Sequence, residues 1–252
     1  MKIVRIKHQE IEQFGTILGH EIQIYHGVPW GNFIESNIFL NVDEVEFLPP
    51  ILPTKIICIA LNYSNSPNNE AFEPVVFLKP PSSLIGNNGK IESPFILLDV
   101  WGESELGIVI NKQAKNITEK ESISYILGYT IANDVTANNI DNRDHHLARS
   151  KCADSFCAVG PWIDTDFNPG NNCIQGFQNN ILIRESNLNK RIWGDAKIIS
   201  WLSSWMTLEP GDLILTGAPP RVTNKIFLKN NDVYSCKIEN LGILENTFIE
   251  KY

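Results

Sequence analysis

Several signatures of common protein classes are missing from this sequence of 252 residues. No window approaches eighteen apolar residues, and the N-terminal stretch has no apolar core of the signal-peptide kind. Lysine and arginine nowhere form a run, and the net charge is −8. A negative chain without a basic run argues against nucleic acid and anionic membranes as partners. We therefore predict a cytoplasmic protein with no nucleic-acid and no membrane partner.

Signatures of nucleophilic, redox and nucleotide chemistry are also lacking. The five cysteines contain no Cys-x-x-Cys pair, which argues against a zinc site or thioredoxin-type chemistry. There is no Gly-x-Ser-x-Gly elbow, no phosphate-binding loop and no dinucleotide-binding glycine pattern. The sequence therefore indicates neither a serine nucleophile of this kind nor a nucleotide ligand.

The residues that are present indicate a mainly β protein with few helices. At 43% hydrophobic and 20% charged residues, the chain can bury a sizeable core in one large domain with a small appendage. A hairpin around residues 19–21 predicts a small β-rich segment over 1–50, and the prolines of 49–53 predict a break before a main domain over 51–252. Runs rich in β-branched and aromatic residues predict strands at 55–61, 75–79, 103–110, 125–133, 156–163, 180–184, 212–216, 232–239 and 243–249.

Two helices interrupt this pattern. Thr118 and Glu121 have the spacing of a capping box and predict a short helix to about Tyr125. Apolar residues at helical spacing predict a second helix over 195–206. The fold class is therefore α+β.

Three carboxylates and one lysine form the strongest chemical pattern. Glu103 and Glu105 lie two apart on a predicted strand, so their side chains point to the same face. Asp134 and Lys151 follow downstream. Oxygen ligands suit Mg²⁺, Mn²⁺ or Ca²⁺, and the lysine would cancel the charge left by three carboxylates around a divalent ion. On spacing alone, a solvated strand face with two unrelated acids is the commoner explanation, since charged residues are mostly exposed and Glu-x-Glu is a weak pattern.

The chain resembles the fumarylacetoacetate hydrolase superfamily, in particular its branch of 2-hydroxyhepta-2,4-diene-1,7-dioate isomerases, acylpyruvases and oxaloacetate decarboxylases. Each matching segment is short, but together they follow the family's order across about two hundred residues. The segments are Leu61-Asn62-Tyr63, Phe77-Leu78-Lys79-Pro80, 83–86, Glu103-Ser104-Glu105-Leu106, 128–130, Asn133-Asp134-Val135-Thr136, 151–156, 160–162, 207–212, Thr216-Gly217 and Leu241-Gly242.

The resemblance implies a mixed β-sandwich roll and a homodimer. It implies that Glu103, Glu105 and Asp134 hold Mg²⁺ (or Mn²⁺ or Ca²⁺), with Lys151 as a catalytic group beside the ion. It places Lys79 and Thr216 where the family contacts substrate. The implied substrate is a small 2-oxo or 1,3-dioxo carboxylic acid, converted through a metal-bound enolate by an isomerase, tautomerase or decarboxylase.

Departures from the family pattern keep two alternatives open. The family's hydrolases carry a histidine and a glutamate that activate water, and the corresponding positions here are Ser66 and Asn69, which are not general bases near neutral pH. A C–C hydrolase would need Glu70, or one of the adjacent histidines His145 and His146, as its base. A non-catalytic paralogue that binds a metal and an oxo-acid is the second alternative.

Two further departures concern the recognition of substrate carboxylates. Arg221 stands where the family usually has glycine, and Asn138 stands where it usually has arginine. Arginine binds carboxylates through two parallel hydrogen bonds. We therefore consider Arg221 a candidate for a new carboxylate contact.

Overall fold

The structure is a computed structural model that describes residues 1–63, 73–93, 99–139 and 142–250. It confirms a mainly β, α+β fold built from mixed sheets. In the described part the strands are β1 (Lys2–His8), β2 (Ile11–Leu18), β3 (Glu21–Gly27), β4 (Phe33–Asn41), β5 (Glu46–Leu48), β6 (Ile56–Ala60), β7 (Val75–Lys79), β8 (Leu84–Ile85), β9 (Lys90–Ser93), β10 (Val100–Trp101), β11 (Ser104–Ile110), β12 (Ile126–Asp134), β13 (Thr136–Ala137), β14 (Cys157–Asp164), β15 (Cys173–Gln178), β16 (Ile181–Asn187), β17 (Leu213–Leu215), β18 (Val233–Ile238) and β19 (Gly242–Glu250).

Helices are few and short within the described ranges. The α-helices are α1 (Glu119–Ser122), α2 (Ala148–Lys151) and α3 (Asp195–Trp205), and 3-10 turns occupy Val42–Glu44, Pro81–Ser83, Ile123–Tyr125 and Leu188–Lys190. The predicted capping box begins α1, since the Thr118 amide donates to Glu121 Oε2 at 2.9 Å. In this part of the chain no helix has the length and apolar character needed to cross a bilayer.

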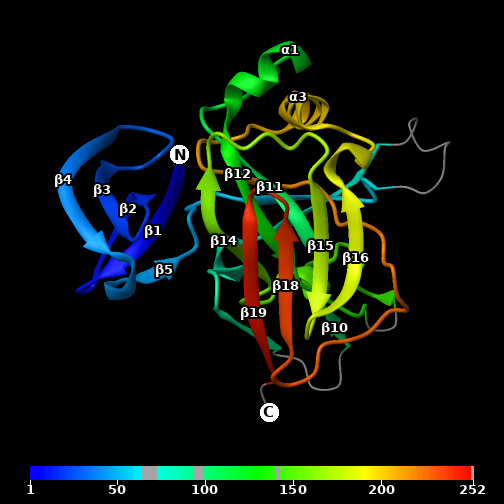
Figure 1. Cartoon of the computed structure of the whole chain (residues 1–252). Coiled ribbons are helices and arrows are strands. Elements are labelled where there is room, and N and C mark those ends of the chain that lie inside the picture. Colours follow the sequence, from blue (N-terminus) through cyan, green and yellow to red (C-terminus); the bar gives the residue numbers. More distant parts are fainter. Residues whose placement is uncertain (64–72, 94–98, 140–141, 251–252) are drawn as a thin grey trace.

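Two sheets pack face to face as the sandwich (Figure 1). The larger runs β4-β3-β2-β1-β14-β12-β11-β17-β6-β7, with β5 beside β1 and β8 beside β14. The smaller runs β16-β15-β18-β19-β9, and a separate pair joins β10 to β13. Their inner faces share one apolar core, which contains Ile108 and Ile131 of the larger sheet and Ile174 and Leu244 of the smaller.

The segment over 1–50 continues the larger sheet instead of forming a separate one. In Figure 1 its strands β1 to β4 lie at one side of the molecule. β1 pairs with β14 through Ile3 and Ile163, so the sheet is unbroken across the two parts. Val4, Ile6, Ile22 and Ile24 nevertheless form a small apolar cluster of their own. The division into 1–50 and 51–252 stays a prediction.

The core of the larger sheet positions the acidic residues. β11 is buried along its whole length, and it pairs with β12 on one side and β17 on the other. A strand that is buried on both faces has a continuous apolar sequence, as Leu106 to Ile110 does. Polar side chains on such a strand are held in one orientation by the packing around them.

Candidate functional site

The three carboxylates predicted to bind metal line a cavity of about 290 Å³, which lies where β11 begins and β12 ends. Residues from seven separate stretches of the chain line it: Ala60, Leu61, Tyr63, Phe77, Glu103, Glu105, Asp134, Leu147, Lys151, Arg184, Ala218, Pro219 and Pro220. The mixture of apolar walls and a few charged groups suits a small polar ligand.

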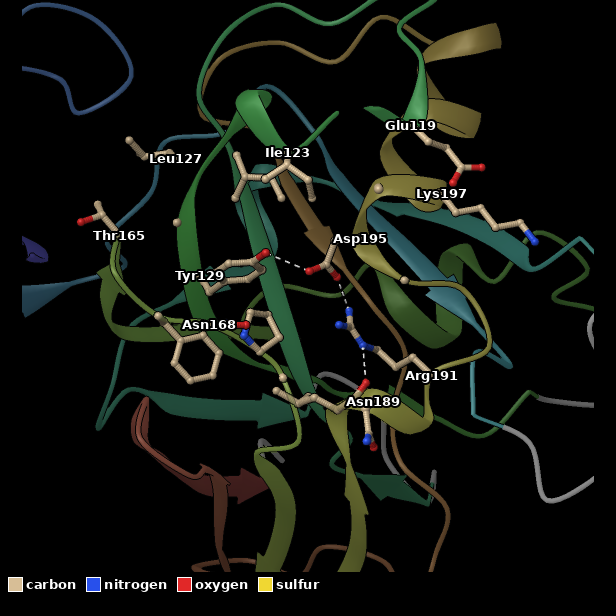
Figure 2. A pocket seen from close by; sticks show the side chains of 18 residues that line it. Glu119, Ile123, Leu127, Tyr129, Thr165, Asn168, Asn189, Arg191, Asp195 and Lys197 are labelled. Atoms are coloured by element: carbon tan, nitrogen blue, oxygen red, sulfur yellow. Dashed lines mark hydrogen bonds and ion pairs between the residues drawn. The ribbon is translucent and has the colours of Figure 1, made fainter. Parts of the chain in front are cut away.

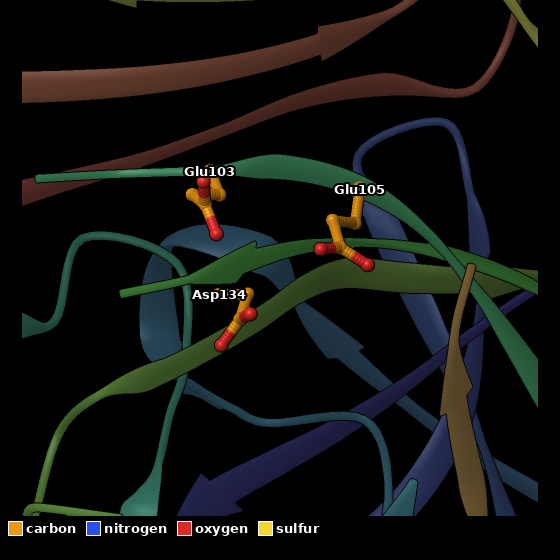
Figure 3. A group of neighbouring side chains, drawn as sticks. All are labelled: Glu103, Glu105 and Asp134. Carbon is orange, nitrogen blue, oxygen red and sulfur yellow. The ribbon is translucent and has the colours of Figure 1, made fainter. Parts of the chain in front are cut away.

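Three carboxylates of the cavity lining are neighbours, as Figure 3 shows. One oxygen from each of Glu103, Glu105 and Asp134 lies within 4.8 Å of the others. Glu105 is on β11, Glu103 directly precedes it, and Asp134 ends the antiparallel β12. The Asp134 amide donates to the Glu103 carbonyl at 2.9 Å, and the Glu103 amide donates to the side chain of Asn133 at 2.9 Å. The strand register therefore brings Asp134 to Glu103 and Glu105, which lie 31 and 29 positions earlier in the sequence.

Two buried lysines lie against the carboxylates. The Lys151 ammonium, at the end of α2, donates to Glu103 Oε2 at 3.0 Å and also to Asp134. Lys79 reaches the other oxygen of Asp134 from β7 and donates to the carbonyls of Val135 at 3.0 Å and Phe156 at 2.7 Å. Both Asp134 oxygens are thus held by ammonium groups.

Arg184 is a member of this site that the sequence reasoning missed. From β16 its guanidinium donates to Glu103 Oε1 at 2.6 Å and to the Pro219 carbonyl at 2.7 Å. The available signal was an arginine ending the apolar run Ile181 to Ile183, because a charged residue is almost never fully buried unless it is paired.

The charges shift the pKa values of these groups in opposite directions. Burial alone would raise the pKa of Glu103, but the charges of Lys151 and Arg184 lower it to about 2. Burial and the charges of Asp134 and Glu103 raise the pKa of Glu105 well above its usual range. Burial works against the charged form of Lys151, yet the surrounding carboxylates raise its pKa. Lys151 is therefore a fixed cation at neutral pH.

The donor set fits a hard divalent cation. Each carboxylate oxygen has more than one lone pair, so the contacts made by the basic groups leave acceptor capacity toward the cavity. Only oxygen donors converge among Glu103, Glu105 and Asp134, and oxygen ligands are those preferred by Mg²⁺, Mn²⁺ and Ca²⁺. Because Lys79, Lys151 and Arg184 already offset the three acids, a divalent ion would leave an excess positive charge that suits an anionic ligand.

The two residues predicted to contact substrate have other partners here. Lys79 is 1% exposed, is directed to Asp134 and is not among the residues that line the cavity. The Thr216 hydroxyl donates to the Leu106 carbonyl at 3.0 Å, and this residue is fully buried. These bonds hold β7 and β17 against the site strands. Their predicted contact with substrate remains a prediction.

Of the positions considered for water activation, only His145 and His146 lie within the described residues. Ser66, Asn69 and Glu70 lie outside the described residues. His145 and His146 are both exposed and are absent from the cavity lining. Their neighbour Leu147 does line the cavity.

Tyr63 adds a hydroxyl to the same cavity. Its oxygen is buried and has no hydrogen-bond partner among the described residues. Burial raises the pKa of the Tyr63 phenol, so the group stays protonated at neutral pH. A buried donor without a partner carries a desolvation cost, which a bound oxygen acceptor would remove.

A larger cavity, of about 770 Å³, lies on another part of the molecule (Figure 2). The Tyr129 hydroxyl donates to Asp195 Oδ2 at 2.8 Å, and Arg191 pairs with the other oxygen of Asp195. Arg191 Nε also donates to the Leu188 carbonyl at 3.0 Å. This closed network ties the start of α3 to β12, and we interpret it as structural.

The sequence of this chain matches family models and is similar to the sequences of known proteins. The model of the fumarylacetoacetate (FAA) hydrolase C-terminal family matches residues 55–249, and an Rv2993c-like N-terminal model matches residues 1–50. The uncharacterized protein MJ1656 of Methanocaldococcus jannaschii is 42% identical over 211 residues, which cover 82% of this chain and 85% of that protein. The mitochondrial oxaloacetate tautomerase fahd2 of Xenopus laevis is 35% identical over 226 residues, covering 83% and 70%.

A solved structure extends the similarity to the whole fold. The 2-hydroxyhepta-2,4-diene-1,7-dioate isomerase of Mycobacterium marinum superposes with a TM-score of 0.91 at 32% identity, covering 100% of this chain and 99% of that one. The family model spans most of the chain, including every residue of the carboxylate cavity. The chain therefore belongs to the fumarylacetoacetate hydrolase family.

Proposed function

We propose that this protein is a divalent-metal-dependent enzyme that interconverts the keto and enol forms, or double-bond isomers, of a small 2-oxo carboxylic acid. The observation that carries the proposal is the convergence of Glu103, Glu105 and Asp134 within 4.8 Å in a cavity that basic residues surround. Relatives with the names oxaloacetate tautomerase and 2-hydroxyhepta-2,4-diene-1,7-dioate isomerase support this reaction class.

The proposal gives separate roles to the bound metal ion and to the charged side chains of Lys151 and Arg184. Glu103, Glu105 and Asp134 would hold Mg²⁺, Mn²⁺ or Ca²⁺, which would supply Lewis-acid stabilisation of negative charge on a 2-oxo oxygen. Lys151 stays charged and adds positive potential beside Glu103 and Asp134. Arg184 fixes the orientation of Glu103. In a low-dielectric cavity such preorganised charges need little rearrangement during the reaction.

Tyr63 is the residue that we assign to substrate hydrogen bonding. Its buried hydroxyl lines the cavity without a partner in the described chain, and it can donate to an oxygen of the substrate. In tautomerisation one proton leaves the carbon beside the 2-oxo group and one is taken up by the oxygen, so no co-reactant is consumed. A reaction of this kind needs no activated water.

The assay must distinguish tautomerisation from three alternatives. These are decarboxylation of the same substrate class, C–C hydrolysis of the acylpyruvase or fumarylacetoacetase type, and binding without turnover. The proposed homodimer and the proposed cytoplasmic location rest on the family resemblance and on sequence composition, respectively. Sedimentation of the purified protein tests the first of these.

The decisive experiment follows the ultraviolet absorbance of enol-oxaloacetate after treatment with EDTA and after addition of Mg²⁺ or Mn²⁺. We expect metal-dependent conversion to the keto form without release of pyruvate, and loss of that rate in Asp134→Asn. Lys237→Gln, which removes an exposed charge on β18, is the matched control and should keep full activity. Pyruvate release would indicate a decarboxylase, cleavage of acetylpyruvate a hydrolase, and saturable binding without product a non-catalytic paralogue.

A further inference from the structure

A second group of basic residues lies beside the carboxylate cavity, around the ring of Trp101 in β10. The Lys225 ammonium is 3.2 Å from the centre of this ring, and the Arg221 guanidinium carbon is 5.8 Å from it. Trp101 is two residues before Glu103, and the Leu228 amide donates to the carbonyl of its neighbour Val100 at 2.8 Å. The aromatic face thus holds two cations next to the metal-binding acids.

Strand pairing directs Arg221 to the same side as Arg184. The two residues are opposite each other in an isolated antiparallel bridge beside β16. The Val222 amide donates to Ile183 at 2.9 Å, which confirms that the chain segments are paired. Directly opposed residues in an antiparallel pair project to one face, with their Cβ atoms about 5 Å apart. Arg184 reaches Glu103 and lines the cavity, so Arg221 projects to the same face of this strand pair as a cavity residue, although it lies just outside the cavity lining.

Neither cation has a carboxylate of its own among the described residues. Lys225 Nζ lies 3.4 Å from the side-chain oxygen of Asn138, whose amide nitrogen donates to Asp99 at 2.7 Å. Arg221 forms no ion pair within the described ranges. Burial and the charge of Arg184 lower the pKa of Arg221. Burial and the charges of Arg221 and Arg184 likewise lower the pKa of Lys225. A bound anion would offset the repulsion among these cations.

We propose that Arg221 and Lys225 bind the distal carboxylate of a dicarboxylic 2-oxo acid whose 2-oxo end lies at Glu103, Glu105 and Asp134. This inference rests on the proposed function and narrows its substrate class. The guanidinium offers paired donors that match a carboxylate, and the ammonium offers a second positive contact. Trp101 is the positioning residue, because its ring holds both cations in place.

The test compares 2-oxoglutarate with 2-oxopentanoate, which has the same carbon chain but no distal carboxylate. Calorimetry with Mn²⁺ present measures the dissociation constant of each acid for wild type, Arg221→Gln, Arg221→Lys and the control Lys237→Gln. We expect wild type to prefer the dicarboxylate. Because a hydrogen bond to a charged group contributes enough for a tenfold or larger change, Arg221→Gln should lose about tenfold or more of that preference. Binding of 2-oxopentanoate should stay unchanged, and Arg221→Lys should recover part of the loss.

Each outcome has a separate meaning. If Arg221→Gln weakens both acids equally, or neither, the carboxylate assignment is wrong while the proposed function stands. If Lys237→Gln has the same effect as Arg221→Gln, the preference comes from overall charge and the assignment is again wrong. If wild type binds neither acid with Mn²⁺ and converts no enol, the proposed function fails and this inference fails with it.

Discussion

Replacing Lys79 by methionine separates two roles for this lysine, support of Asp134 and contact with substrate. The Lys79 side chain is 0% exposed and that of Asp134 is 2% exposed. The ammonium also donates to two backbone carbonyls, at 3.0 and 2.7 Å. Methionine has a similar length and no charge, so the substitution removes these bonds without a large cavity.

The expected effect is a large loss of stability. Removing one partner of a buried ion pair leaves the other charge uncompensated and costs about 3–5 kcal/mol. Lys151 still neutralises part of the Asp134 charge, so we expect the lower end, about 3 kcal/mol. For a chain of this size that corresponds to a decrease of about 6–12 °C in the melting temperature.

Thermal and urea unfolding of Lys79→Met, with Lys237→Met as the exposed control, measure this difference. At a temperature where both variants are folded, KM for oxaloacetate should stay within about twofold of wild type, because Lys79 does not line the cavity. An unchanged melting temperature together with a tenfold higher KM would refute the structural role and support direct contact with substrate.

Three other predictions concern the metal, the packing and the pH dependence. Mn²⁺ at about a hundred times its dissociation constant should stabilise the protein by about 2.7 kcal/mol, and Glu105→Gln should remove most of this effect in a thermal-shift assay. Gly102→Ala should destabilise the fold by about 1–3 kcal/mol, because an added Cβ would lie 2.6 Å from ring atoms of Tyr234, whereas Gly194→Ala meets nothing within 4 Å and is the control. The Asp232 carboxyl is partly desolvated, but hydrogen bonds from Asn179, Lys229 N and Gln178 lower its pKa below 3.8. The ionised Asp232 carboxylate therefore contributes to stability above pH 3.8, and this contribution is lost as the pH falls through the pKa of the folded state. In unfolding measurements, the stability difference between wild type and Asp232→Asn should shrink in acid. A difference that stays constant would contradict this reasoning.

Many helices and strands could be predicted from the sequence, because their apolar residues recur with the period of a helix or a strand. The predicted helix over 195–206 is α3, which ends one residue earlier, and the predicted strand 75–79 is β7. The predicted hairpin joins β2 to β3. β4 was missed, since it is an edge strand whose exposed Ile34 and Ile38 break the usual alternation. β1 was missed as well, and its pairing with β14 depends on residues 160 positions away.

The sequence by itself indicated the fold class, and its series of ordered motifs indicated the family and singled out the three carboxylates, because such motifs are local properties of the chain. The spacing of two glutamates on one strand did not by itself distinguish a metal site from a solvated face. Only the tertiary structure decided which cations face them. Arg184, Lys79 and Arg221 come from three distant segments, and strand register alone brings them to the neighbourhood of Glu103 and Asp134. A cation's role depends on the charges within a few ångströms of it, and no one-dimensional spacing reports those distances.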